Sequence, residues 1–148
     1  MRDKVLISLI IAAVLLHLAH SVDHVIRGDF PLVLTTATLV FLATTVALYG
    51  FVAIGLWLYW RGTIGPRFWA IAASIAVAFG WLGHFSPFTE QPPRHILNAY
   101  TSAAAGWLAL FVLIALMLTL IATVLYAGYL WLRPKAQAPA HALDQGAV

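Results

Sequence analysis

The sequence contains no cysteine, which excludes a disulfide framework, a thiolate metal site, a CxxC redox motif and an iron–sulfur cluster held by cysteines. Charged residues are also scarce: they make up 9% of the 148 residues, against roughly 25% in an ordinary soluble domain. The few basic residues form no patch that would follow the phosphates of a nucleic acid. A single water-soluble core and a nucleic-acid partner are therefore excluded.

Apolar residues are abundant instead. They make up 63% of the chain, and the mean hydropathy is +0.94. They lie in long runs without period-two alternation, a pattern typical of membrane helices rather than strands. We therefore expect an all-α integral membrane protein, a four-transmembrane-helix bundle surrounded by the lipid bilayer. The spans are expected at residues 5–26, 32–60, 68–85 and 102–132.

The ends of the chain carry two further expectations. The first span resembles a signal peptide, but a histidine at the −3 position makes a poor cleavage site, so we expect the span to be retained. Residues 1–133 form the transmembrane domain. Residues 134–148 are rich in Ala, Pro and Gln, which predicts a disordered cytoplasmic tail.

The basic residues predict the orientation of the bundle. Only Arg27 and Arg94 flank one set of span ends, whereas six basic residues flank the other set: Arg2, Lys4, Arg61, Arg67, Arg133 and Lys135. The positive-inside rule then places both termini and the loop between the second and third spans in the cytoplasm. The expected location is the bacterial inner (plasma) membrane.

A stripe of histidines occupies the outer half of the first span. At 100° per residue, His17, His20 and His24 fall within about 60° of arc on one helix face, with Asp23 on its flank. Ionisable groups at membrane depth are expensive and usually line a cavity or pathway, so the stripe predicts a functional site. Two alternatives remain open: single histidines can be satisfied at packing interfaces, and Asp23 can pair with Arg27 at i, i+4.

Two more histidines are expected on the same side of the membrane. His84 ends the third span, and His95 lies in the connection between the third and fourth spans. Imidazole binds Zn, Ni, Cu and Fe, which the sequence does not distinguish, and a carboxylate can add a ligand or orient an imidazole. The predicted metal ligands are His17, His20, Asp23, His24, His84 and His95. Haem b held by two of His17, His20, His24 and His84 is the alternative cofactor.

The string His17-x5-Asp23-His24 resembles the signature of the nickel/cobalt permeases of the HupE/UreJ group. That family's pattern runs His-Pro, then a glycine, then Asp-His at the same spacing, whereas this chain has Leu18 for the proline and Ser21 for the glycine. The resemblance covers eight of the 148 residues, and the family has more spans than four. It implies metal coordination by His17, Asp23 and His24.

These patterns support several functions of different kinds. The first is metal handling at the extracytoplasmic side, as a transport component, a delivery protein or a sensor, with a homo-oligomer or a membrane-complex partner as a possible requirement. The second is a haem b subunit that exchanges electrons with quinone or a redox partner. A membrane metalloenzyme and a structural small subunit without chemistry are the others, so enzymatic activity stays open.

Overall fold

The computed structural model describes residues 3–29, 35–89 and 91–133. The helices are α1 (Lys4–Ile26), α2 (Thr36–Arg61), α3 (Pro66–His84), α4 (Pro93–Asn98) and α5 (Ala103–Leu132). Within these ranges no strand occurs, and four helices are long and apolar enough to cross a membrane. The predicted all-α class and four-helix transmembrane arrangement are confirmed, and the apolar helices indicate a multi-pass protein in contact with the bilayer.

The four long helices lie over the four expected spans. The helix over the expected span 32–60 begins at Thr36, while residues 30–34 lie outside the described residues, as do residues 134–148, where the tail is expected. The connection after α3 contains the short helix α4, which the apolar runs did not predict because it has only 6 residues.

Local signals set the helix ends. The Asp3 side chain accepts a hydrogen bond of 2.9 Å from the Leu6 backbone N–H, and Thr35 caps the start of α2 in the same way. The chain leaves α2 at Gly62, whose φ of 86° lies in the left-handed region that favours glycine. A second glycine of this kind, Gly28 with φ 80°, follows α1.

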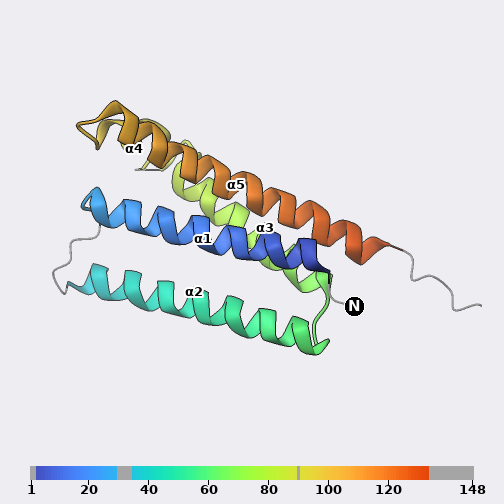
Figure 1. The fold of residues 1–148 in the computed structure, drawn as a ribbon. Coiled ribbons are helices and arrows are strands. Elements are labelled where there is room, and N and C mark those ends of the chain that lie inside the picture. The colour runs from blue at the N-terminus through green and yellow to red at the C-terminus, as the bar shows by residue number, and fades with distance from the viewer. Residues whose placement is uncertain (1–2, 30–34, 90, 134–148) are drawn as a thin grey trace, which may run out of the picture.

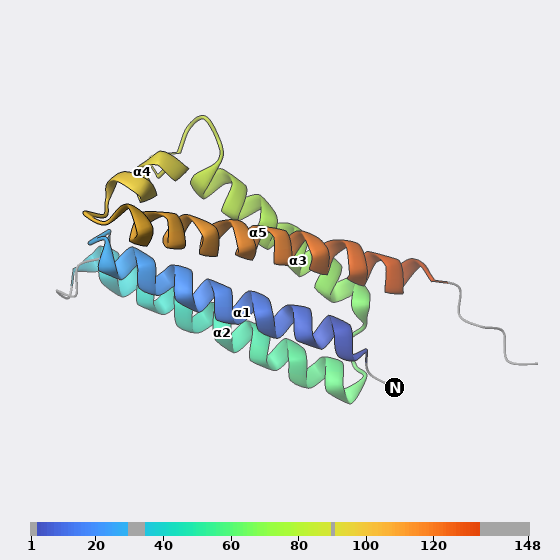
Figure 2. The ribbon, with the colours of Figure 1, turned by 45° about the horizontal axis from the view of Figure 1, so that its top comes forward.

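Helix α5 is the central packing partner of the bundle. Both α1 and α3 pack along it, and α1 lies between α5 and the peripheral α2 (Figures 1 and 2). All four long helices meet in one buried apolar cluster near the start of α1, whose members are Leu6, Ile10, Tyr59, Trp69, Ala70 and Ala127. This cluster therefore packs the four long helices against one another at this end of the bundle.

Close helix contacts position the other end. A Cβ atom on Gly80 of α3 would lie 2.5 Å from Sδ of Met117, so the glycine lets α3 approach α5. A Cβ on Gly106 of α5 would lie 3.0 Å from the backbone oxygen of Leu97, so α4 rests directly on α5. Ile96 of α4 is fully buried against α5. These contacts place α4 at the same end of the bundle as the last turn of α1, where His95 of α4 lies 3.8 Å from Asp29 (Figure 1).

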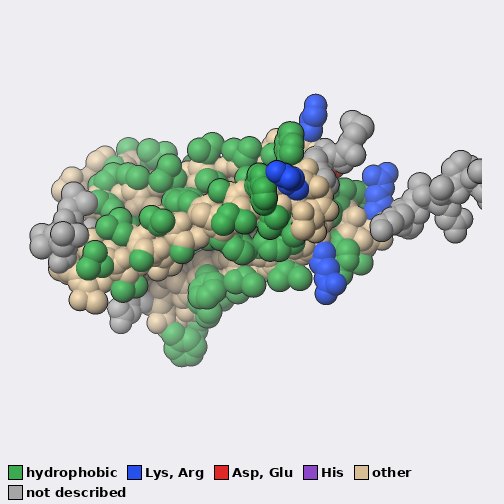
Figure 3. Space-filling model, turned by 90° about the horizontal axis from the view of Figure 1, so that it is seen from below, with side chains coloured by type: hydrophobic (Ala, Val, Ile, Leu, Met, Phe, Trp, Pro, Cys, Tyr) green, Lys and Arg blue, Asp and Glu red, His purple; other side chains and the backbone are tan. Residues whose placement is uncertain are grey.

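The two ends of the bundle carry different side chains. Hydrophobic side chains cover much of its length, and Lys and Arg side chains gather at the end where α1 begins and α5 ends (Figure 3). The histidines at the ends of α1 and α3 lie at the opposite end. A basic end and a histidine-bearing end are thus separated by the length of the membrane helices.

Candidate metal centre

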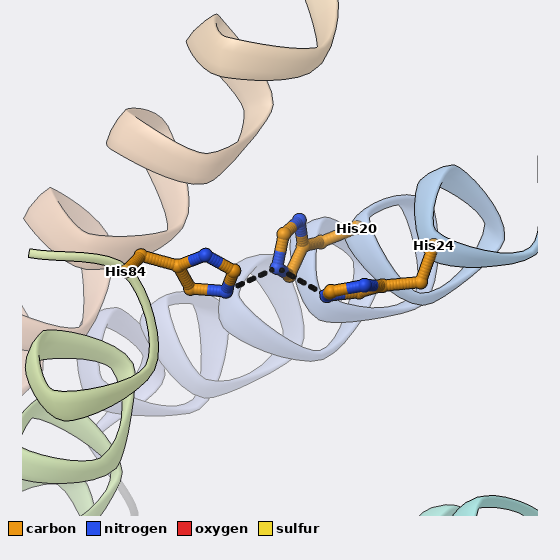
Figure 4. A group of neighbouring side chains, drawn as sticks. All are labelled: His20, His24 and His84. Atoms are coloured by element: carbon orange, nitrogen blue, oxygen red, sulfur yellow. Dashed lines mark hydrogen bonds between the residues drawn. The ribbon is translucent and has the colours of Figure 1, made fainter. Parts of the chain in front are cut away.

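Three histidines from two helices converge at the end of the bundle. His20 and His24 come from the last two turns of α1, and His84 is the last residue of α3. Their side chains point toward one another (Figure 4). His20 Nε2 lies 3.1 Å from His84 Nε2 and 3.2 Å from His24 Nε2. His20 and His84 are buried, with relative exposures of 6% and 8%.

The spacing of the three nitrogens fits a shared metal ion. One ligand atom from each ring lies within 4.8 Å of the other two. Two nitrogens bound 2.0–2.1 Å from a tetrahedral zinc ion are about 3.3 Å apart, close to the separations His20 makes with its two neighbours. These three residues could therefore hold one ion and leave a fourth position open, as in zinc sites that bind water or a substrate.

The other ring nitrogens of His84 and His24 have acceptors. His84 Nδ1 lies 3.2 Å from the Gln91 backbone carbonyl, which can only accept, so Nδ1 carries the proton and Nε2 carries the lone pair. His24 Nδ1 lies 2.9 Å from Asp29 Oδ2. A proton on this Nδ1 can likewise be donated to the carboxylate. An acceptor behind a histidine is the arrangement that fixes the tautomer of metal ligands.

His20 completes the argument because it contacts both neighbours through one atom. A ring nitrogen has one in-plane position, occupied by a proton or by a lone pair. If the proton of His20 is on Nε2, this one proton lies between two acceptors, His24 Nε2 and His84 Nε2. The lone pair on His20 Nδ1 then faces the Asp23 carboxylate, whose Oδ2 is 3.8 Å away. With the proton on Nδ1, which has no hydrogen-bond partner, and with the His24 proton on Nδ1 toward Asp29, three lone pairs converge. A cation among them satisfies all three.

A charged cluster lies behind the histidines. Arg27 is buried and pairs with both carboxylates, through Nε to Asp23 Oδ2 at 2.9 Å and through Nη1 to Asp29 Oδ2 at 2.7 Å. Arg27 Nη2 also lies 3.1 Å from His24 Nδ1. A guanidinium can only donate, so this contact favours the His24 tautomer with its proton on Nε2, whereas the Asp29 contact favours the one with its proton on Nδ1. The two carboxylates and one guanidinium sum to one formal negative charge, which favours a cation at the neighbouring imidazoles.

Tyr100, between α4 and α5, closes this cluster from the far side. Its hydroxyl donates a hydrogen bond of 2.5 Å to Asp23 Oδ1. Burial, together with this bond, raises the pKa of the Tyr100 phenol to about 12. The hydroxyl is therefore a donor at any physiological pH, and it holds Asp23 in place beside His20.

The predicted ligands fall into two groups. His20, His24 and His84 come together, with Asp23 beside them but paired to Arg27. His17 lies one turn deeper, where its Nδ1 contacts the Tyr49 hydroxyl at 3.1 Å. His95 lies on α4, with its side chain 48% exposed and its Nε2 3.8 Å from Asp29 Oδ1. The set implied by the permease resemblance, His17 with Asp23 and His24, is thus not the set that converges.

Three supporting groups were not expected from the sequence. Asp29 is the acceptor behind His24, the Gln91 carbonyl is the acceptor behind His84, and Tyr100 binds Asp23. The Asp29 position, five residues after His24, is the one signal that could have been noticed, because the chain turns back at Gly28. The other two depend on how α4 packs on α5, which no local pattern reports.

Comparison of the chain with protein-family models, with curated proteins and with solved structures gives no match. The arrangement of side chains therefore carries the functional argument alone.

Proposed function

We propose that this protein binds a divalent transition metal ion through Nε2 of His20, His24 and His84, and that it handles this metal at the extracytoplasmic side of the membrane. The observation that carries the proposal is the convergence of three ring nitrogens, with His84 fixed by the Gln91 carbonyl so that its lone pair points inward. Imidazole ligands suit Zn, Ni, Cu and Fe.

Metal handling is favoured over a purely structural role by two features. A three-nitrogen site leaves an open coordination position, so a bound ion can exchange ligands or take up water. The site also lies near helix ends rather than in the middle of the bundle. Transport, delivery and sensing all require such exchange, and a homo-oligomer or a partner protein would extend the pathway beyond one chain.

The proposed side follows from charge. At the end opposite the histidines, Arg61 is the last residue of α2, Arg67 lies in the first turn of α3 and Arg133 follows α5. The positive-inside rule assigns that end to the cytoplasm and the metal centre to the extracytoplasmic side. In a bacterium, this membrane would be the inner membrane.

The spacing of the histidine nitrogens does not favour the haem alternative. Axial ligands of a haem iron lie on opposite faces of the porphyrin, so their nitrogens are about 4 Å apart with the ring between them. His20 and His84 nitrogens are 3.1 Å apart, which leaves no room for a porphyrin plane. Their packing suits a bare ion.

Elemental analysis tests the proposal directly. Protein purified in detergent without a histidine tag should contain one transition metal ion per chain after incubation with zinc and removal of excess. His20→Ala/His24→Ala should lose the ion, whereas His17→Ala, which removes a histidine of the same helix outside the centre, should keep it. Equal metal content in the wild type and the double variant would refute the proposal.

A further inference from the structure

His95 is separated from the three-histidine centre by one carboxylate. Its Nε2 lies 3.8 Å from Asp29 Oδ1, and the other oxygen of Asp29 lies 2.9 Å from His24 Nδ1. The His95 side chain is 48% exposed, whereas the side chains of Asp29 and His20 are 11% and 8% exposed. Asp29 therefore lies between His95 and the outer nitrogen of His24, and Arg27 pairs with the same carboxylate, while the other nitrogen of the His24 ring faces the centre.

The surface beside His95 is hollowed. The hollow has a volume of about 290 Å³ and is lined by Thr89, Pro92, Arg94, His95 and Asn98. Imidazole is the strongest transition-metal donor in this lining, since the hydroxyl and amide are weak ligands for such ions and the guanidinium repels them. An ion that enters the hollow from water is thus expected to bind His95.

The centre needs such a route because its ligands are buried. His84, which contacts His20, is followed by the segment that joins α3 to α5, and this segment carries Gln91, His95 and Tyr100. An ion that exchanges stepwise between donors avoids shedding its whole hydration shell at once. A carboxylate next to an imidazole also lowers the charge that the ion presents during this transfer.

We propose that His95, assisted by Asp29, is the access ligand through which a divalent transition metal ion passes between water and the three-histidine centre. This inference rests on the proposed function, since it assumes that the centre binds the ion. His95 contacts the ion in transit and is not one of its final ligands. Its removal therefore slows loading and release by the same factor and leaves the dissociation constant unchanged.

Cobalt(II) loading measured by stopped-flow absorption tests the inference, because the visible bands of bound cobalt report its coordination. His95→Ala should load at least about ten-fold more slowly than the wild type, with the same final spectrum and the same stoichiometry. Arg94→Ala is the matched control on the same helix and in the same hollow, and it should load as fast as the wild type or faster. His95→Cys, which restores a metal donor in a chain without other cysteines, should recover much of the rate.

Three outcomes would overturn the inference. Equal loading rates in His95→Ala and the wild type would show that the ion takes another route. A changed final spectrum or a lost ion in His95→Ala would make His95 a ligand of the centre itself. Equal slowing in Arg94→Ala would assign the effect to the shape of the hollow. A wild type that binds no cobalt would refute the proposed function, which is a different failure.

Discussion

Nε2 of His84 lies 3.1 Å from Nε2 of His20, although 64 residues separate the two in the chain. The helices that carry them, α1 and α3, both pack along α5 and meet in the apolar cluster near the start of α1, so this pair joins them at the other end of the bundle. An ion bound by both residues would link α1 to α3 directly.

Metal binding is therefore expected to stabilise the fold. A ligand that binds only the folded state at 100 times its dissociation constant adds about 2.7 kcal/mol to the free energy of unfolding. Thermal melting in detergent should show a higher midpoint with zinc, and a chelator should reverse the change. His84→Ala should abolish the zinc-dependent shift, while His17→Ala should retain it. A shift of equal size in His84→Ala would mean that zinc stabilises the protein elsewhere.

Asp29→Asn should weaken metal binding without removing the site. The carboxylate lies 2.9 Å from His24 Nδ1 and pairs with Arg27, so loss of its charge leaves the His24 ring less firmly oriented and the arginine less neutralised. Substitution of the hydrogen-bonding partner of a metal ligand typically reduces metal affinity 10–100-fold, and asparagine keeps an acceptor oxygen, so we expect the lower end of this range. Zinc titration calorimetry should show this decrease with an unchanged stoichiometry of one.

Asp3→Asn is the matched control for this change. Asp3 is a carboxylate at the other end of α1, where it caps the helix and accepts from the Tyr126 hydroxyl at 3.1 Å. Asparagine also caps helices well, so the variant should fold and bind zinc like the wild type. Wild-type affinity in Asp29→Asn would contradict the role given to this carboxylate.

Tyr100→Phe should reduce both stability and zinc affinity. Removing a donor to a carboxylate costs about 2 kcal/mol, and Asp23 then loses one of the groups that hold it beside His20. The pKa of Tyr100, about 12, lies above the ordinary value of about 10, so the folded state favours the neutral phenol. Its contribution is complete below about pH 10 and is lost as the pH rises through about 12.

The difference in unfolding free energy between Tyr100→Phe and the wild type should therefore be constant between about pH 6 and pH 9. Tyr126→Phe is the comparison, because Tyr126 also donates to a carboxylate but at the opposite end of the bundle. It should leave zinc affinity unchanged. A difference that disappears within this pH range, or equal zinc binding in both variants, would contradict the assignment.

Much of the fold and part of the centre could be predicted from the sequence, for a physical reason. Apolar runs long enough to cross a bilayer must be helical, because the backbone has to satisfy its own hydrogen bonds there. The period of the helix then placed His20 and His24 on one face, and the order of the spans placed His84 at the same end. Each of these inferences uses only local geometry and a count of membrane crossings.

The other contacts of the centre depend on packing between helices, which the sequence does not show. His17 shares the helical stripe, but at its depth the contact it makes is with Tyr49 of α2. Asp23 was expected as a ligand or as a partner of Arg27, and the structure has the ion pair at 2.9 Å. Gln91 and Tyr100 reach the centre because Gly106 lets α4 lie directly on α5. Spacing in the sequence reports none of these contacts.

The side of the membrane that carries the centre can be tested with introduced thiols, since the chain has no cysteine of its own. Asn98 of α4 and Thr63 of the loop between α2 and α3 are both exposed and lie at opposite ends of the bundle. If the basic end is cytoplasmic, a membrane-impermeant maleimide should label Asn98→Cys in intact cells and Thr63→Cys only after permeabilisation. The reverse pattern would place the three histidines in the cytoplasm, where they would meet the metal pool of the cell interior, and metal handling at the outer face would be refuted even if zinc binds.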